Sequence, residues 1–181
     1  FILPDGRENG NSDTAEIVLG DGQALQITGI PQVSGLVTRT YIAPADSTVF
    51  QLANQDSPAA IVWNTRPETL GVDLLTDGMD PLPADATVIQ VWKGRVYAAQ
   101  YLESDNQTVV WFSQPLGFHL FDLRKDFIMI PGRVTMLAPH DEALLIGSDD
   151  RIYAYTTESL TTIAPYGAIP GWNWSEDDGR I

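Results

Sequence analysis

The sequence contains no cysteine, only two histidines, and ten lysine or arginine residues against 24 aspartate or glutamate residues. The absence of cysteine excludes a disulfide framework, a thiolate zinc site and a cysteine nucleophile. The formal net charge of −14 opposes binding to a nucleic acid backbone or an anionic lipid surface, because like charges repel. No apolar run approaches the ~20 residues that a membrane-spanning helix needs. We therefore expect no nucleic acid partner and no membrane insertion.

Motifs that would indicate catalysis are also missing. The chain has no G-x-S-x-G elbow, no H-E-x-x-H pair and no phosphate-binding glycine loop. His119 stands in an apolar stretch, which favours a structural or buried role, and His140 stands in a polar turn. We predict a non-enzymatic protein with no catalytic residue, no cofactor and no metal site.

Acidic residues gather in three turn-like contexts, at Asp141–Glu142, Asp149–Asp150 and Glu176–Asp178. Two carboxylates at a suitable separation are enough for a glycosidase, so a glycan-degrading enzyme remains the third hypothesis for function. The same oxygens suit calcium, although none of these turns follows the twelve-residue calcium-loop pattern. Solvated turns explain the acids more simply, and the pattern leaves open whether any of them binds calcium.

Short apolar runs rich in β-branched and aromatic residues alternate with turn signals such as Asp21-Gly22, Lys93-Gly94 and Pro131-Gly132. No long segment keeps a 3.6-residue apolar period, so helices should be scarce. The sequence predicts an all-β fold. It begins at Phe1 without a methionine and shows no signal peptide, and we interpret it as a piece of a longer protein.

The first 67 residues resemble part of a β-sandwich of the immunoglobulin or fibronectin type, expected to be incomplete at its N-terminus. Residues 68–87 follow as an extended linker rich in acids and proline, whose leucines are expected to pack onto a neighbour. The strands predicted in the first module are Glu16–Leu19, Leu25–Thr28, Leu36–Ile42, Val49–Ala53 and Ala60–Trp63.

Residues 88–181 are predicted to form two consecutive four-stranded antiparallel meanders, at 88–133 and 134–181. The cycle that starts at Val88 starts again at Val134, an offset of 134 − 88 = 46 residues. A propeller blade takes about 40–50 residues, so each meander resembles one blade. A propeller needs about four to eight blades to close. We therefore expect either further blades outside this chain or strand edges that pair with another chain.

Tryptophans are the other conspicuous side chains. Trp92 and Trp111 fall inside predicted strands, and we expect both to fill the space between the two meanders. Trp172 and Trp174 alternate next to an acidic stretch near the end of the chain. This pair is our candidate contact for a partner or a glycan, with packing in a core as the alternative.

Five stretches carry a resemblance to a known family: Phe1–Ser12, Ile27–Pro31, Val37–Ala53, Gly71–Ala98 and Val110–Pro115. Through them, nearly the whole chain resembles bacteriophage and prophage virion proteins of the tail apparatus, in which an immunoglobulin- or fibronectin-like module precedes propeller-like repeats. In that family the last matched strand leads to a short aromatic loop, at Phe118–Phe121 in this chain. The usual arginine of the first hairpin is displaced to Arg39.

What the resemblance implies is a structural component of a phage tail or tail-like particle that acts by subunit assembly. Its expected partners are other virion or tail subunits, including copies of itself. Its expected location is the virion, assembled in the cytoplasm of the bacterial host. The family supplies no catalytic residue to carry over. A carbohydrate- or receptor-binding module of a host-recognition protein is the second hypothesis, motivated by Trp172 and Trp174.

Overall fold

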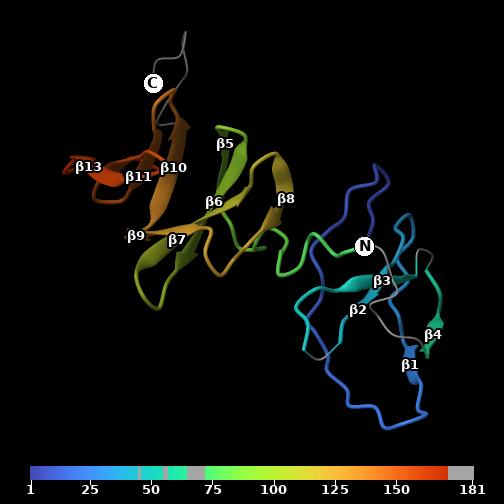
Figure 1. Ribbon diagram of the computed structural model, residues 1–181. Helices are drawn as coiled ribbons and strands as arrows, with labels where there is room; N and C mark the ends of the chain where they lie inside the picture. The colour runs from blue at the N-terminus through green and yellow to red at the C-terminus, as the bar shows by residue number, and fades with distance from the viewer. Residues whose placement is uncertain (45, 55–56, 65–71, 171–181) are drawn as a thin grey trace. The chain divides into compact units, whose positions relative to one another are not determined.

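A computed structural model describes residues 1–44, 46–54, 57–64 and 72–170 of the chain. Within these ranges all helical or extended regular structure consists of β-strands. The strands pair into antiparallel sheets, none of which closes into a barrel. The predicted all-β class is therefore confirmed. The chain divides into two compact units, Phe1–Met79 and Asp80–Ile181 (Figure 1).

The first unit contains two small antiparallel sheets. Strand β1 (Leu25–Thr28) pairs with β4 (Ala60–Trp63), and β2 (Thr40–Ile42) pairs with β3 (Gln51–Asn54). The second pair is the predicted hairpin, in which Tyr41 lies opposite Leu52. β-Branched and aromatic residues favour these extended segments because they pack well on a pleated surface.

Residues 72–79 of the predicted linker belong to this unit. The backbone N–H of Leu52 donates to Val72 O at 2.8 Å, and the N–H of Leu74 donates to Phe50 O at 2.8 Å. This segment therefore extends the sheet at the edge of β3. Leu75, by contrast, is 87% exposed, so the expectation that the leucines of this segment pack onto a neighbour is wrong for this residue.

The strand predicted at Glu16–Leu19 is wrong. No regular structure occurs there, and Ile17 and Val18 are largely exposed. A turn does follow, closed by the Gln23 N–H donating to Gly20 O at 3.1 Å. The segment has strand composition, but a strand also needs a partner for its backbone hydrogen bonds.

The second unit begins with a four-stranded antiparallel meander in the order β5-β6-β7-β9. Strand β8 pairs with the far end of β7 and forms an insertion between β7 and β9. The resemblance implied an aromatic loop at Phe118–Phe121, and that expectation is wrong because these residues are part of β8. The strand bounds are β5 Val88–Trp92, β6 Arg95–Leu102, β7 Gln107–Gln114, β8 Gly117–Phe121 and β9 Phe127–Pro131.

The second meander runs in the order β10-β11-β12-β13 and confirms the predicted repetition of four antiparallel strands. Only Gly132 and Arg133 separate β9 from β10. The strand bounds are β10 Val134–Pro139, β11 Leu144–Ser148, β12 Ile152–Tyr155 and β13 Leu160–Ala164.

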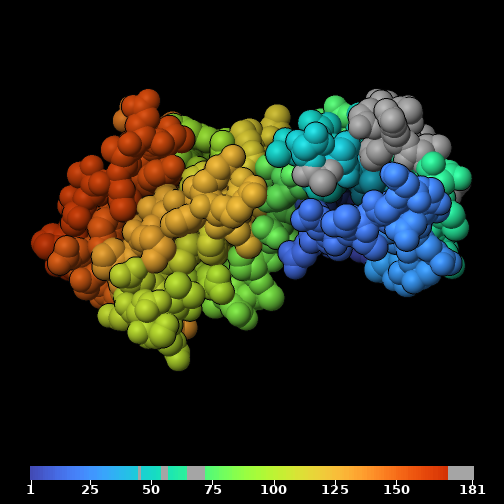
Figure 2. Space-filling view, turned by 60° about the horizontal axis from the view of Figure 1, so that its bottom comes forward, coloured from blue at the N-terminus to red at the C-terminus, as the bar shows by residue number. Residues whose placement is uncertain are grey.

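The two meanders share one apolar core. Figure 2 shows the residues of the second meander, in orange and red, against those of the first, in yellow and green. Burial of these side chains is the main stabilising term, at roughly 25 cal/mol per Å² of apolar surface. The fully or nearly buried members are Trp92, Tyr97, Ala99, Val110 and Ile130 from the first meander and Val134, Leu137, Leu144, Ile146 and Tyr153 from the second.

Trp92 links the two meanders directly. Its Nε1–H donates to His140 O, in the turn between β10 and β11, at 2.6 Å. Its ring centroid lies 5.7 Å from that of Tyr97 and 6.1 Å from that of Tyr155 of β12. Tilted aromatic pairs at such distances stabilise a core beyond simple area burial. Burial raises the pKa of Tyr97 to about 12, so this ring stays neutral at physiological pH.

Trp111 does not fill the space between the meanders, and that expectation is wrong. Its strand neighbour Val110 points into the shared core, so Trp111 lies on the opposite face of the sheet. There it is half-buried, donates through Nε1 to Gln100 Oε1 at 3.1 Å, and packs its ring against Phe127 at 5.4 Å.

Candidate interaction surface

The first meander carries apolar residues on both faces of its sheet. Cross-strand partners share a face in an antiparallel sheet. The row Val88, Ala99, Val110 and Ile128 faces the shared core. The neighbouring row, Ile89, Ala98, Trp111 and Phe127, faces the other way.

We call this second side the outer face. On it, Val91 lies opposite Val96, and Val109 lies opposite Met129. The central residues Ala98 and Val109 are buried, whereas the side chains on the two outermost strands are not: Ile89 is 52% exposed and Met129 is 40% exposed. Large apolar side chains that stay exposed next to one another are typical of a surface that another molecule covers.

Strand edges offer a second kind of contact. The described strand β13 pairs with β12 alone, and β9 pairs with β7 alone. An edge strand presents unpaired N–H and C=O groups, to which a further strand can add. The second unit therefore combines an apolar outer face with open sheet edges.

The acids Asp149 and Asp150 are used within the fold. Asp149 Oδ1 accepts from the backbone N–H of Arg133 at 3.3 Å, and Asp150 Oδ1 accepts from Ser148 Oγ at 2.9 Å. A Cβ on Gly132 would collide with the Asp149 carboxylate, and one on Gly167 would collide with the Asp149 backbone. These contacts hold the β9–β10 connection, the β11–β12 turn and the segment after β13 together.

Asp141 and Glu142 are exposed in the turn between β10 and β11. The carbonyl oxygen of Glu142 accepts from Lys93 Nζ at 3.5 Å. His140 of the same turn is exposed, and its Nδ1 accepts from the Glu142 N–H at 3.3 Å. Its carbonyl oxygen receives Trp92 Nε1–H, so the main contribution of His140 is made by its backbone. His119 of β8 is half-buried, in agreement with a structural role.

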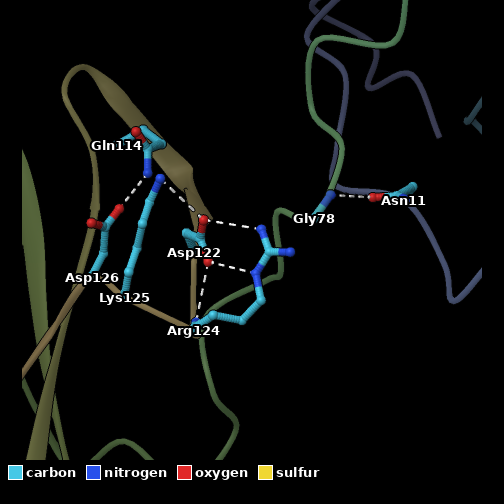
Figure 3. A network of polar contacts seen from close by, with 7 residues as sticks. All are labelled: Asn11, Gly78, Gln114, Asp122, Arg124, Lys125 and Asp126. Atoms are coloured by element: carbon cyan, nitrogen blue, oxygen red, sulfur yellow. Dashed lines mark hydrogen bonds and ion pairs between the residues drawn. The ribbon is translucent and has the colours of Figure 1, made fainter. Parts of the chain in front are cut away.

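A polar network surrounds a buried carboxylate between β8 and β9 (Figure 3). The side chain of Asp122 is only 3% exposed. Its Oδ1 accepts from Arg124 Nε at 2.9 Å, and its Oδ2 lies 3.4 Å from Lys125 Nζ. Hydrogen bonds from Arg124 hold the pKa of Asp122 at about 2, against the opposing effect of desolvation. Asp122 therefore stays ionised over the physiological range and fixes the loop.

The same network is anchored to β7. Gln114 Nε2 donates to Asp126 Oδ2 at 2.5 Å, and the N–H of Asp126 donates to Asp122 O at 2.9 Å. The N–H of Phe112 donates to Asp126 O at 3.0 Å. The cations at the tip of the loop are therefore held by the carboxylate beneath them, and the network positions β9 on the sheet.

Trp172, Trp174 and the acids Glu176–Asp178 lie outside the described residues. The interpretation of the two tryptophans as a partner or glycan contact stays a prediction. Among the residues that the structure describes, no group of three or more histidine or acidic side chains is arranged to hold a metal ion. The described part of the chain also has no helix that is long and apolar enough to cross a membrane.

Sequence reasoning missed the outer face and Asp122. The outer face leaves a signal, because β6, β7 and β9 are apolar at consecutive positions where a half-buried strand would alternate. Asp122 leaves a weaker one, the run Asp122-Leu-Arg-Lys-Asp126 between two apolar strands. Compared with protein-family models, curated proteins and solved structures, the chain matches none.

Proposed function

We propose that this chain is a non-enzymatic structural component of a phage tail or tail-like virion particle and acts by assembling with neighbouring subunits. The observation that carries the proposal is the outer face of the first meander. Its core-facing side packs into the core shared with the second meander, and its other side still presents Ile89, Val91, Phe127 and Met129 to solvent.

Two further features support an assembly role. The sequence resembles virion proteins of the tail apparatus over nearly its full length. The repetition of a four-stranded meander, with a core shared between neighbours, also suits a blade that stacks on another blade. Apolar area on a sheet face costs free energy while it is exposed to water. Its burial in a complex would stabilise that complex by roughly 25 cal/mol per Å².

The test is co-sedimentation and light scattering of the full chain with the other subunits of its particle, added one at a time. We expect at least one subunit to bind the wild-type chain. The double variant Ile89→Asp/Val91→Asp should lose that binding, because a charge on the outer face would be desolvated in the complex. Leu75→Asp is the matched control, since Leu75 is 87% exposed and lies in the first unit.

A chain that binds none of the virion subunits would contradict the proposal. So would the release of reducing ends from a panel of host polysaccharides, because only cleavage produces them. Binding that survives Ile89→Asp/Val91→Asp would remove the outer face from the mechanism.

A further inference from the structure

We propose that β13 is the strand through which two copies of this chain pair, edge to edge and antiparallel, so that their second meanders form one continuous sheet. The inference rests on the proposed assembly function and names one contact within it. It identifies the partner as a second copy and the contact as a backbone ladder.

The edge at β13 has few of the features that usually protect an edge strand. Proteins discourage such pairing with charged residues, proline, β-bulges or a covering segment. Of these, β13 has a register shift against β12 that falls after Thr162. The sequence Leu160-Thr-Thr-Ile-Ala164 contains no charge and no proline, and its first four residues are exposed. Among the other edge strands of this unit, β9 ends in Pro131 and is flanked by Lys125, Asp126 and Arg133, β5 is followed by Lys93, and β10 ends in Pro139. These edges therefore carry charges or proline that β13 lacks.

The backbone geometry indicates which groups of β13 face outward. The turn between β12 and β13 is closed by the Thr156 N–H donating to Ser159 O at 2.8 Å. Along an antiparallel pair, hydrogen-bonded and non-hydrogen-bonded positions alternate. Leu160, opposite Tyr155, and Thr162, opposite Tyr153, then occupy the non-hydrogen-bonded positions. Their N–H and C=O groups point to the open edge, where they can pair with another strand.

Charge favours this edge as the place where two copies meet. Each copy carries a formal charge of −14, which opposes contact between identical chains. From Ser159 to Pro170, however, no residue is charged. Two such edges bring no like charges directly opposite each other, and the remaining long-range repulsion is screened by salt, with a Debye length of about 8 Å at physiological ionic strength. Pairing should therefore strengthen as salt is raised.

The strand is also complementary to itself. Centred on Thr161, an antiparallel pair places Leu160 opposite Thr162 of the other copy and Thr161 opposite Thr161, and it uses the part of β13 before the register shift. Threonine pairs and β-branched pairs are favourable across strands. A symmetric contact of this kind closes with two copies. So short a pair of strands buries less than the ~1,200 Å² of a standard interface, so the dimer should be weak and concentration-dependent.

The experiment is sedimentation velocity of the full 181-residue chain over a hundredfold range of concentration, at low and high salt. We expect a monomer–dimer equilibrium that shifts toward dimer at high salt. Thr162→Pro should weaken it at least tenfold, because proline removes an outward N–H without removing a bond to β12. Thr162→Val keeps that N–H and the branched side chain, and should dimerise like the wild type.

Circular dichroism and thermal unfolding establish that Thr162→Pro is folded, and Thr162→Lys serves as a second edge-blocking variant if it is not. A wild-type chain that stays monomeric at every concentration would overturn the proposal. So would dimers that persist in both blocking variants, or that are lost equally in Thr162→Val. Binding to other virion subunits is measured separately in Thr162→Pro, and if it persists there, the assembly function stands without this contact.

Discussion

Glycine is required at residue 167 because the chain after β13 passes directly over the β11–β12 turn. A Cβ at this position would collide with the backbone of Asp149 and would also crowd the amide of Asp150. The next residue, Ala168, is held by its N–H donating to Ser148 O at 2.8 Å and by its carbonyl accepting from Thr135 Oγ1 at 3.1 Å. The segment therefore has little room to move aside.

We predict that Gly167→Ala lowers the free energy of unfolding of the second unit by about 2–3 kcal/mol, as overpacking against backbone typically does. Urea unfolding followed by tryptophan fluorescence measures the change. Gly20→Ala is the control, since only the flexible side chain of Gln23 lies near its Cβ. An unchanged midpoint for Gly167→Ala would show that the segment after β13 is not fixed there.

Asp122 gives the protein a defined response to acid. Its pKa in the folded chain is about 2, below the ordinary value of 3.8, chiefly because of the hydrogen bonds from Arg124. A carboxyl with a lowered pKa stabilises the fold above its unfolded pKa, and this contribution is lost as pH falls through the folded value. The window is therefore pH 4 to 2, and the loss is about 1–2 kcal/mol, allowing for the exposure of both cations.

Denaturation followed between pH 5 and pH 2 tests this, with Asp122→Asn as the comparison. We expect the variant to be less stable at pH 5 and to lose less stability across the window than the wild type. Parallel pH profiles for the two proteins would contradict the assigned role of Asp122.

Among the elements, β5 contacts the second sheet of its unit through Trp92, which donates to His140 O and packs its ring against Tyr155. Trp92→Phe removes the hydrogen bond to His140 O and leaves the space of the larger indole ring unfilled in the shared core. We predict a loss of about 2–3 kcal/mol in unfolding free energy, measured by urea titration. Trp111→Phe also loses an indole hydrogen bond, but at a half-buried site on the outer face. It should cost about 1 kcal/mol or less, and equal losses in the two variants would contradict this comparison.

Local sequence predicts the meander strands well because most of them meet their partner through a short turn. Lys93 and Gly94 both adopt positive φ in the β5–β6 turn, as glycine-containing hairpin turns require. The predicted strand at Glu16–Leu19 failed because strand composition does not supply a partner. The register of a strand decides on which face of the sheet Trp92 and Trp111 lie. The sequence specifies this register only weakly where a strand is apolar on both faces, so tertiary packing decides it.

The sequence predicted open strand edges but not the residues of the outer face. Which residues form the outer face depends on which side of the first meander the second meander covers. Local sequence does not decide between the row that contains Val110 and the row that contains Trp111, since both rows are apolar. Asp122 became recognisable only once the loop placed Arg124 and Lys125 beside it.

At the scale of the whole molecule, the two units differ in how much apolar surface they bury. Among the described residues, Leu52 is the one buried apolar residue of the first unit, whereas the second unit has sixteen. Stability is not uniform across such a chain, and regions with few buried apolar contacts open first.

We predict that limited thermolysin digestion cuts the first unit before the second. The first cut should fall between Glu16 and Leu19, where Ile17 is 61% exposed and no strand protects the backbone. Mass spectrometry of early digests identifies the site. A first cut within residues 88–164 would show that the meanders are the less stable part.

Only two residues connect β9 to β10, and the two meanders of the second unit share one core, so two chains cannot easily exchange a meander with each other. Exchange of one meander for that of another molecule would have to separate Trp92, Tyr97 and their neighbours from the whole set of partners across the core. We therefore expect this unit to enter any larger assembly as an intact block that makes its contacts through its surface and its strand edges.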